Sequence, residues 1–309
     1  MDDQIRVANI PVVDIDCAMN VIAPYIDGVW SDTSRQGKQL KRKRFKNLLH
    51  MTARFLLRKL SRNLSSRGSE ADVRAFYETA HASVEFTGYR QASNHVTYLY
   101  RGQVLSLSGM GNYRLKSGLL TQILEQLHPR SVCEAGCGRI RHLAYFSPKF
   151  PEINFSGFDI SENAISFGKY LQGLETFDPN LPERPGDVLS ESEMQCIRAV
   201  NLFQASAANL SCVEDNAFDL VYTVSALEQM NAILPAVLKE LHRVTRRYVV
   251  FFEPFADANG FFEKTYLWAG NYFHIKSADL ERYGFRPLLV VPLPTKPSFA
   301  DCLVVAEKM

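Results

Sequence analysis

Residues 132–138 read Val-Cys-Glu-Ala-Gly-Cys-Gly, an apolar run that ends in an acid and then turns through two glycines. This pattern predicts a buried strand, followed by a tight turn that opens a helix. Gly136 and Gly138 give the backbone the freedom to turn, and they leave room for a ligand to approach the main chain. A glycine turn can also do no more than join a strand to a helix, so a binding function needs support from other segments.

A second acidic strand end lies further along the chain. Residues 157–161 read Gly-Phe-Asp-Ile-Ser, and Asp159 is placed where a carboxylate can accept two hydrogen bonds from a ribose diol. The dinucleotide fingerprint G-x-G-x-x-G does not fit, because its third glycine falls on Arg141. A pyrophosphate also favours a helix N-terminus without nearby anions, yet Glu134 directly precedes the turn. These residues better suit a ligand with an amino-acid head and an adenosine but no phosphate.

Predicted strands and helices alternate from residue 130 onward, which is typical of βαβ units in a mainly parallel sheet. The predicted strands are Ser131–Glu134, Ile153–Asp159, Val200–Ala205, Phe218–Val224, Tyr248–Glu253, Pro287–Pro292 and Cys302–Ala306. The predicted helices are Arg139–Ser147, Glu162–Tyr170, Leu227–Val244 and Ala278–Tyr283, preceded by Glu70–His81 and Leu115–Leu127. We expect an N-terminal extension at 1–68, a helical cap or lid region at 69–127 and an α/β domain at 128–309.

The motifs resemble those of the class I, Rossmann-like S-adenosylmethionine-dependent methyltransferases, over about residues 112–309. Residues 134–138 resemble the first family motif, E/D-x-G-x-G-x-G, with Ile140 in the place of its last glycine. Residues 206–210 resemble the D-A-x-x-L segment beside the adenine, with Ser206 in the place of the aspartate. Three later segments resemble D-N-S-F-D-L-V, S-x-x-L-E-H-M and K-E-x-x-R-V of the quinone- and small-molecule-type subgroup, at residues 215–221, 225–230 and 239–244.

The resemblance implies an α/β fold, in which a seven-stranded, mostly parallel Rossmann-like sheet has helices on both faces. The last strand of the sheet would be antiparallel. A mainly helical N-terminal extension would precede the α/β domain. The implied cofactor is S-adenosyl-L-methionine, with S-adenosyl-L-homocysteine as product. The cofactor-binding residues that the resemblance and the spacing suggest are Glu134, Ala135, Gly136, Cys137, Gly138, Asp159, Ile160, Ser206, Ala207, Val224 and Tyr77.

An oxygen acceptor usually needs a base near its proton, so we looked for acids and histidines near the expected strand ends. His274 follows an aromatic-rich stretch, Glu253 ends a strand and Glu228 starts a helix. Each also has a structural interpretation: a surface or capping histidine, a structural hydrogen bond, and favourable charge at a helix N-terminus, respectively. His95 is a fourth candidate. No metal site is predicted, because the six cysteines are scattered and form no CxxC pair.

The expected acceptor follows from motifs that the sequence lacks. Residues 223–226 read Thr-Val-Ser-Ala, where methyltransferases of adenine or glutamine amino groups carry [D/N]-P-P-[Y/F/W]. No paired-glutamate loop of the arginine-modifying kind is evident either. We therefore predict O-methylation of a small-molecule, sugar or lipid-linked acceptor. Two alternatives stay open: a nucleic-acid-modifying or nucleic-acid-binding protein, and an inactive cofactor-fold scaffold, for which Ser206 and Ile140 are the support.

The net charge of +2 hides a strongly basic segment in an otherwise acidic chain. Residues 35–67 hold 12 of the 35 Lys and Arg residues and none of the 33 acids. No aromatic stacking platform interleaves the basic run, so nucleic acid is an unlikely partner. A basic run followed by an amphipathic helix at Asn47–Leu64 favours an anionic membrane surface, bound through residues 35–64. Alternatively, the apolar side of this helix, which includes Leu48, Leu49, Phe55 and Leu56, packs on the α/β domain.

Composition excludes several classes of protein. Hydrophobic residues make up 46% and charged residues 22%, which favours a folded chain over a disordered one. No apolar run reaches the roughly 18 residues of a membrane-spanning helix. The N-terminal Met-Asp-Asp lacks the pattern of a secretion signal. We therefore expect a cytoplasmic protein that also associates with a membrane face, and the sequence does not predict its oligomeric state.

Overall fold

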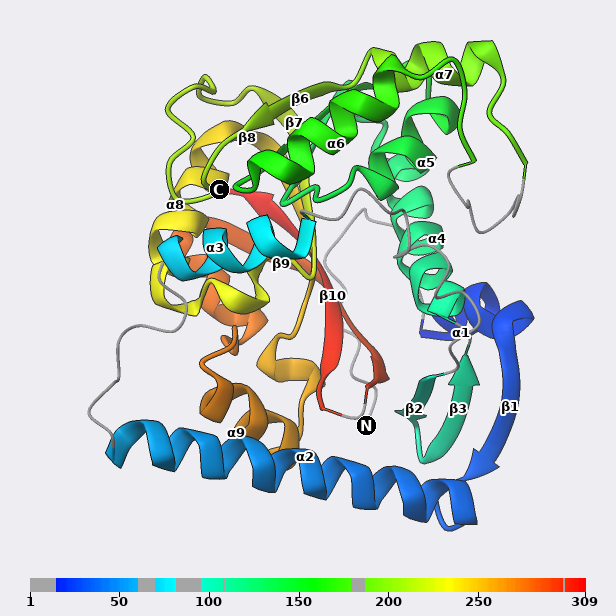
Figure 1. Ribbon diagram of the computed structural model, residues 1–309, viewed down its shortest axis with the longest axis vertical. Helices are drawn as coiled ribbons and strands as arrows, with labels where there is room; N and C mark the ends of the chain where they lie inside the picture. The colour runs from blue at the N-terminus through cyan, green and yellow to red at the C-terminus, as the bar shows by residue number, and fades with distance from the viewer. Residues whose placement is uncertain (1–14, 61–69, 82–95, 108, 179–186, 297) are drawn as a thin grey trace.

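The structure is a computed structural model that describes residues 15–60, 70–81, 96–107, 109–178, 187–296 and 298–309. Within this part of the chain one sheet runs through the molecule, with helices on both faces (Figure 1). Its strands are β1 (Ile26–Ser31), β2 (Val96–Tyr100), β3 (Gln103–Leu107), β4 (Ser131–Ala135), β5 (Asn154–Asp159), β6 (Asn201–Gln204), β7 (Phe218–Val224), β8 (Thr245–Glu253), β9 (Phe285–Thr295) and β10 (Ala300–Lys308). The α-helices are α1 (Ile15–Ile22), α2 (Arg35–Leu60), α3 (Glu70–His81), α4 (Gly109–Leu127), α5 (Arg141–Lys149), α6 (Glu162–Gly173), α7 (Glu191–Arg198), α8 (Leu234–Val244) and α9 (Phe261–Gly270).

The sheet differs from the predicted one in size and in strand direction. Its order is β1-β3-β2-β9-β10-β8-β7-β4-β5-β6. The five strands from β8 to β6 in this order are parallel, and β10 is antiparallel to β8, as predicted for the last strand. The other four pairs are also antiparallel. A seven-stranded, mostly parallel sheet is therefore wrong: the described residues form ten strands, and five of the nine neighbouring pairs are antiparallel.

The three additional strands come from the region that we predicted to be mainly helical. Strands β1, β2 and β3 have only five or six residues each, which is too short for a clear period-two pattern. Arg101 and Gly102 join β2 to β3 in a two-residue turn, and both have positive φ, at 47° and 76°. Such a turn usually contains Asn-Gly or Asp-Gly, so Arg-Gly gave no hairpin signal.

The core lies on both faces of the sheet, because alternate side chains of each strand point to opposite faces. On β7, Leu220 and Tyr222 join the cluster under α4 and α5, whereas Val221 joins the cluster under α8. Helix α8 buries five residues spaced by three or four, namely Leu234, Val237, Leu238, Leu241 and Val244. This spacing places them on one side of the helix, so α8 is held on the sheet by its apolar face.

One predicted helix is broken into pieces. The sequence suggested a continuous helix over Leu227–Val244, but the structure has two 3₁₀ turns, Leu227–Gln229 and Asn231–Ile233, before α8 begins. Pro235 lies in the first turn of α8, where its missing N–H costs no hydrogen bond. A proline also disfavours helical backbone in the residue before it, so the helix begins here and does not extend from Leu227.

The basic segment forms one long helix, α2, which starts at Arg35 and not at Asn47. Its buried face includes Leu40 and Met51, whereas Leu49 and Leu56 are exposed. The leucines therefore do not form the single stripe that the sequence suggested. Helix α2 packs against α9 and runs along one side of the molecule (Figure 1). No helix in the described residues combines the length and the apolar character needed to cross a bilayer.

Candidate active site

A cavity lies at the carboxyl ends of the parallel strands, which is where open α/β sheets bind ligands. Its walls come from five segments that are far apart in the sequence. The lining residues are Gly136 and Gly138; Phe158, Asp159 and Ile160; Ala205, Ser206 and Ala207; Val224, Ser225, Ala226, Met230 and Ile233; and, from α3, Glu70, Val73 and Tyr77. Eight of the eleven residues that we predicted to bind the cofactor thus share one cavity. Glu134, Ala135 and Cys137 do not line it.

The glycine turn after β4 is fixed by backbone geometry. Gly136 has a φ of 75°, and a side chain at this position would place its Cβ 2.6 Å from the Cβ of Ala226. The main-chain N–H groups of Gly136 and Cys137 both donate to the carbonyl of Phe158. The turn is therefore tied to the end of β5, and only glycine at position 136 keeps the cavity open.

Ile140 occupies the place of the last glycine in the resembling motif. Its φ is 56°, a left-handed conformation that a β-branched residue rarely adopts. The side chain is fully buried, and the absent Cβ of Gly168 leaves room for it, because a Cβ there would lie 2.8 Å from Ile140 Cγ2. The backbone thus keeps the shape that glycine would give, and apolar packing holds Ile140 in it.

Asp159 joins the glycine turn to the start of α6. Its Oδ2 accepts from the N–H of Gly138 and its Oδ1 from the N–H of Ser161, both at 2.9 Å. Ser161 caps α6 as predicted, since its Oγ accepts from the N–H of Ala164. A carboxylate has about four acceptor sites, so Asp159 retains capacity for the two hydroxyls of a ribose.

Glu134 lies behind the glycine turn, away from the cavity lining. Its Oε2 accepts from the hydroxyl of Tyr222 at 3.0 Å, and its Oε1 lies 3.2 Å from Nδ1 of His142. Burial, together with the charge of Glu134, raises the pKa of Tyr222 well above its usual value. The structure therefore places this acid as a buried support of the first strand end, which differs from the direct ligand contact that we expected.

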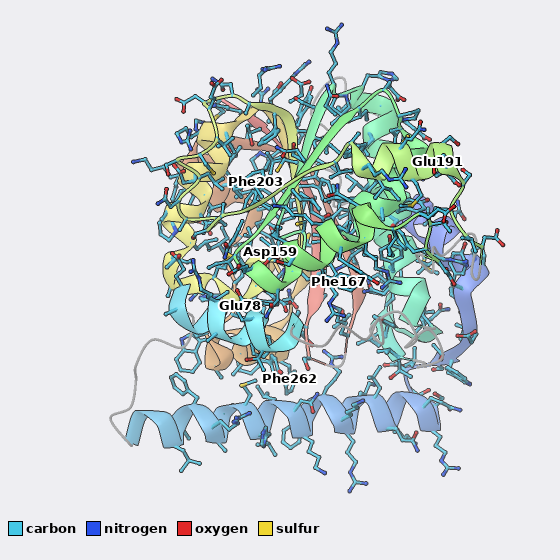
Figure 2. All side chains as sticks on the ribbon, turned by 45° about the horizontal axis from the view of Figure 1, so that its top comes forward. Glu78, Asp159, Phe167, Glu191, Phe203 and Phe262 are labelled. Carbon is cyan, nitrogen blue, oxygen red and sulfur yellow. The ribbon has the colours of Figure 1, made fainter. Side chains whose placement is uncertain are left out.

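Helix α3 covers the cavity, and one carboxylate fastens it to α6. The Oε1 of Glu78 accepts from the N–H of Glu162 at 2.7 Å, and its Oε2 accepts from the N–H of Asn163 and from the Ser161 hydroxyl, both at 3.1 Å. Figure 2 shows Glu78 near the start of α6 and close to Asp159. Burial raises the pKa of Glu78, but the hydrogen bonds from the two amides outweigh it and lower that pKa. Sequence reasoning missed Glu78, because its partners lie more than eighty residues away.

None of the three predicted catalytic residues lines the cavity, but Glu253 contacts Ala226, which does, and Glu228 follows Ala226 by two residues. Glu253 is fully buried, and its Oε1 accepts from the N–H groups of Ala226 and Leu227 at 2.9 and 3.1 Å. Burial raises the pKa of Glu253 to about 8 and also raises the pKa of Glu228. Burial, followed by the charge of Glu228, raises the pKa of Tyr77, which lines the cavity.

His274 and its aromatic neighbours are placed differently from the expectation. The Nδ1 of His274 lies 2.6 Å from the carbonyl oxygen of Tyr272, and His274 does not line the cavity. Phe262 and Trp268 are half exposed, whereas Phe273 is buried in the core. These aromatic side chains therefore do not form one acceptor pocket. His95 lies outside the described residues.

A buried ionic cluster adjoins the cavity, and sequence reasoning missed it. The ammonium groups of Lys116 and Lys296 lie 2.6 and 3.0 Å from the same oxygen, Oδ2 of Asp301. Lys116 also donates to the Oγ of Ser225, which lines the cavity. Burial raises the pKa of Asp301, but the two lysines outweigh it and lower the pKa to about 2. Lys116 comes from α4, and the two other charges come from the β9–β10 turn and the start of β10, so no local motif announces them.

Comparisons with known proteins agree with this architecture. Residues 133–252 match the family model of a methyltransferase domain. The [4+2]-cyclase SpnF superposes with a TM-score of 0.50 at 13% identity, covering 77% of this chain and 96% of that one. Geranyl diphosphate C-methyltransferase from Streptomyces coelicolor A3(2) superposes with a TM-score of 0.49 at 11% identity, covering 79% of this chain and 100% of that one. Human N-acetylserotonin methyltransferase superposes with a TM-score of 0.43 at 12% identity, covering 64% of this chain and 53% of that one.

No curated protein matches the sequence. The likeness to the cyclase, at 13% identity, concerns the fold alone. The family match covers the segment that contains the glycine turn, Asp159 and the end of β7. The cavity offers what the donor needs: a glycine turn without side chains, a carboxylate for the ribose and apolar walls. Residues 133–252 thus resemble a methyltransferase domain, and the cavity beside them has features that suit S-adenosylmethionine as a ligand.

Proposed function

We propose that the enzyme transfers a methyl group to an oxygen atom of a small-molecule, sugar or lipid-linked acceptor. The observation that carries this proposal is Ser225, which lines the cavity and at the same time accepts a hydrogen bond from buried Lys116. The cavity wall is therefore polar at Ser225, with buried charges directly behind it. Such a wall suits an acceptor with hydroxyl groups, because polar groups that leave water need hydrogen-bond partners.

The donor side is held by three elements of this chain. Asp159 would accept from the ribose hydroxyls, the apolar side chains of Ile160 and Ala207 would flank the adenine, and Tyr77 would cover the site from α3. When bound, S-adenosylmethionine supplies an electrophilic methyl group on a sulfonium, whose sulfur takes the bonding electron pair. Because this leaving group is already good, correct placement of the acceptor provides much of the rate.

Glu228 is our proposed base. Its raised pKa brings the carboxylate closer to neutrality, where a general base is most effective. As the acceptor oxygen forms its bond to the methyl carbon, the proton of that oxygen passes to Glu228. Glu253 has a different role in this proposal: its two hydrogen bonds to the main chain fix the turn on which Glu228 lies.

Methyl transfer from radiolabelled S-adenosylmethionine to a panel of hydroxylated small molecules and glycosides tests the proposal. We expect Glu228→Gln to lower kcat by about 10²–10⁴ while donor affinity, measured by calorimetry, is kept. His274→Ala is the matched comparison, because the His274 ring is held at the carbonyl of Tyr272, and it should retain near-full turnover. If Glu228→Gln keeps its turnover and His274→Ala loses it, the assignment of the base is wrong.

The same experiments address the two alternatives. An inactive scaffold would bind no donor in calorimetry or would transfer no methyl group to any acceptor. A nucleic-acid enzyme would methylate RNA or DNA in place of the small-molecule panel, and it would give a salt-dependent gel shift. As a further partner we propose an anionic lipid surface, for which the structure supplies new residues.

A further inference from the structure

Helix α2 carries ten Lys and Arg residues and no acid. Lys41 pairs with Asp32, and Arg44 pairs with Glu263 of α9. In contrast Lys38, Arg42 and Lys46 are exposed and have no ion-pair partner among the described residues. Their positive charges therefore face solvent and are not neutralised by an acidic side chain among the described residues.

The same outer side of α2 also exposes large apolar side chains. Phe45, Leu49 and Leu56 are 53%, 54% and 53% exposed. At 100° per residue they lie within about 40° of one another around the helix axis; Lys38 falls in that sector and Arg42 lies about 20° beyond it. Leu40 and Met51 are buried on the opposite side, where α2 packs on the molecule. Figure 2 shows side chains of α2 that point away from the rest of the molecule.

Helix α9 extends this surface. Phe262 is 49% exposed and lines a groove together with Lys41, Arg44 and Phe45 of α2. Trp268 is 51% exposed, and its ring lies 4.4 Å from that of Phe55. Aromatic side chains of this kind favour the boundary between headgroups and acyl chains.

We infer that this docking face, defined as the outer side of α2 with Phe262 and Trp268 of α9, binds a lipid surface that carries anionic headgroups. Lysines and arginines between exposed apolar residues match such a surface in both charge and polarity. A nucleic acid would neutralise the cations, but it would leave Leu49 and Leu56 in water. A lipid surface accommodates both kinds of side chain, which is why we favour it.

The docking face is next to the acceptor side of the site. Asn47 of α2 donates to the Oγ of Ser298 in the β9–β10 turn. The same turn carries Lys296, which pairs with Asp301 in the buried cluster. Docking through α2 would therefore bring the polar wall close to a lipid surface. This placement suits a lipid-linked acceptor, although membrane binding itself does not depend on which acceptor is used.

Co-sedimentation of the full chain with vesicles tests the inference. We expect binding to vesicles of phosphatidylglycerol and phosphatidylcholine, and none to phosphatidylcholine alone. Binding should be lost at about 1 M salt, where the screening length falls to about 3 Å. Each cation near such a surface raises the binding constant by about fivefold, so Lys38→Gln, Arg42→Gln and Lys46→Gln together should weaken binding about 100-fold.

A matched control removes the same charge elsewhere. Lys149→Gln, Lys169→Gln and Lys239→Gln change three exposed lysines on α5, α6 and α8 and should retain binding. Leu49→Ser with Leu56→Ser should weaken binding about tenfold, because less apolar surface leaves water. All variants should keep their thermal stability and donor affinity, since the changed side chains are exposed and remote from the cavity.

The inference would be overturned if the unchanged protein did not bind anionic vesicles at low salt, or if it bound RNA but not vesicles. It would also be overturned if the control triple variant lost as much vesicle binding as the α2 triple variant, or if the leucine variant bound as well as the unchanged protein. Concentration-dependent self-association without vesicle binding would assign the face to a second copy of the chain and would also overturn it. Methylation of a water-soluble acceptor tests the proposed function separately, and we expect all of these variants to retain it.

Discussion

The part of the site that we propose for the donor, the donor side, is held by main-chain hydrogen bonds. Charged side chains hold the part that we propose for the acceptor, the acceptor side. Asp159 and the glycine turn are connected through the amides of Gly136, Gly138 and Ser161. The acceptor side depends instead on the cluster of Lys116, Lys296 and Asp301 with Ser225. The difference teaches where each side is vulnerable: backbone conformation on the donor side, and charge balance on the acceptor side.

This contrast also explains two departures from the resembling motifs. Ile140 and Ser206 replace residues of the usual pattern, yet the chain forms a hydrogen-bonded turn at each. Ile140 keeps the left-handed conformation of the expected glycine. Ser206 fixes its own turn, because its Oγ accepts from the N–H of Ala208. A side built from main-chain groups tolerates such replacements, provided that the chain keeps its path.

The largest expected effect is on the acceptor side, where Lys116→Met should break the charge balance. Asp301 would keep only Lys296, and removing one partner from a buried ion pair costs about 3–5 kcal/mol of the free energy of unfolding. Urea unfolding measures this loss. Arg282→Met is the control, because the Arg282 side chain is 79% exposed at 3.5 Å from Asp279. Such an exposed pair contributes about 0–1 kcal/mol. If the two variants lost the same free energy of unfolding, the buried cluster would contribute no more to stability than an exposed ion pair.

On the donor side, Gly136→Ala tests whether backbone conformation and space are the limiting factors. An alanine at positive φ costs about 1–2 kcal/mol. At position 136 the new Cβ would also collide with Ala226, at 2.6 Å. Gly102→Ala is the matched control, because Gly102 has a similar φ of 76° and no atom within 4 Å of the added Cβ. We expect Gly136→Ala to lose more stability than Gly102→Ala and also to lose donor affinity in calorimetry.

The donor-side interpretation would be contradicted if both alanine variants bound the donor equally well. In that case the glycine would serve only the fold. A loss of affinity without additional loss of stability would still support it, because the collision with Ala226 narrows the cavity wall.

Much of the donor side could be predicted from the sequence, because its parts are local. The glycine turn, the acidic strand end and the N-cap each span only a few consecutive residues. Each therefore gives a short sequence pattern, such as residues 132–138. The alternating strands and helices after residue 130 were equally readable, since periodicity reports burial on one face. The broken helix before α8 was missed, although Pro235 was visible, because the apolar spacing of Leu227–Val244 continues through it.

The parts that the sequence could not show depend on long-range contacts. The ends of the cluster, Lys116 and Asp301, are separated by most of the α/β domain, and a lysine in an amphipathic helix looks solvent-exposed. The hairpin β2–β3 was missed because Arg101 stands where a turn usually has Asn or Asp. The outward leucines of α2 share an apolar pattern with its inward face, and only packing distinguishes the two sides.

The buried acid between the two sides predicts a dependence on pH. Burial raises the pKa of Glu253 to about 8, from 4.5. Between these values the folded protein retains a proton that the unfolded chain has released, so the free energy of unfolding falls as pH rises, by at most about 1.4 kcal/mol per unit. Glu253→Gln should remove this contribution and flatten the profile. The exposed Glu125→Gln should leave the slope unchanged. Identical slopes in urea unfolding of all three proteins would show that Glu253 ionises normally.

The smallest effect should come from loosening α3 above the donor side. Glu78→Gln keeps the size of the side chain but removes the negative charge at the N-terminus of α6, a contribution of about 0.3–1 kcal/mol. We expect donor affinity to fall about threefold to tenfold, with faster donor release in stopped-flow measurements and an unchanged kcat at saturation.

The control for this last change is Glu125→Gln on α4, which removes an exposed carboxylate far from α6. The pKa of Glu78 is lowered, so its contribution is present at neutral pH and disappears only as the pH falls below the ordinary value of 4.5. The wild-type and Glu78→Gln proteins should therefore converge in donor affinity under acidic conditions. Unchanged release rates would show that α3 is held by its apolar contacts alone, and the donor side would then depend on packing as well as on main-chain hydrogen bonds.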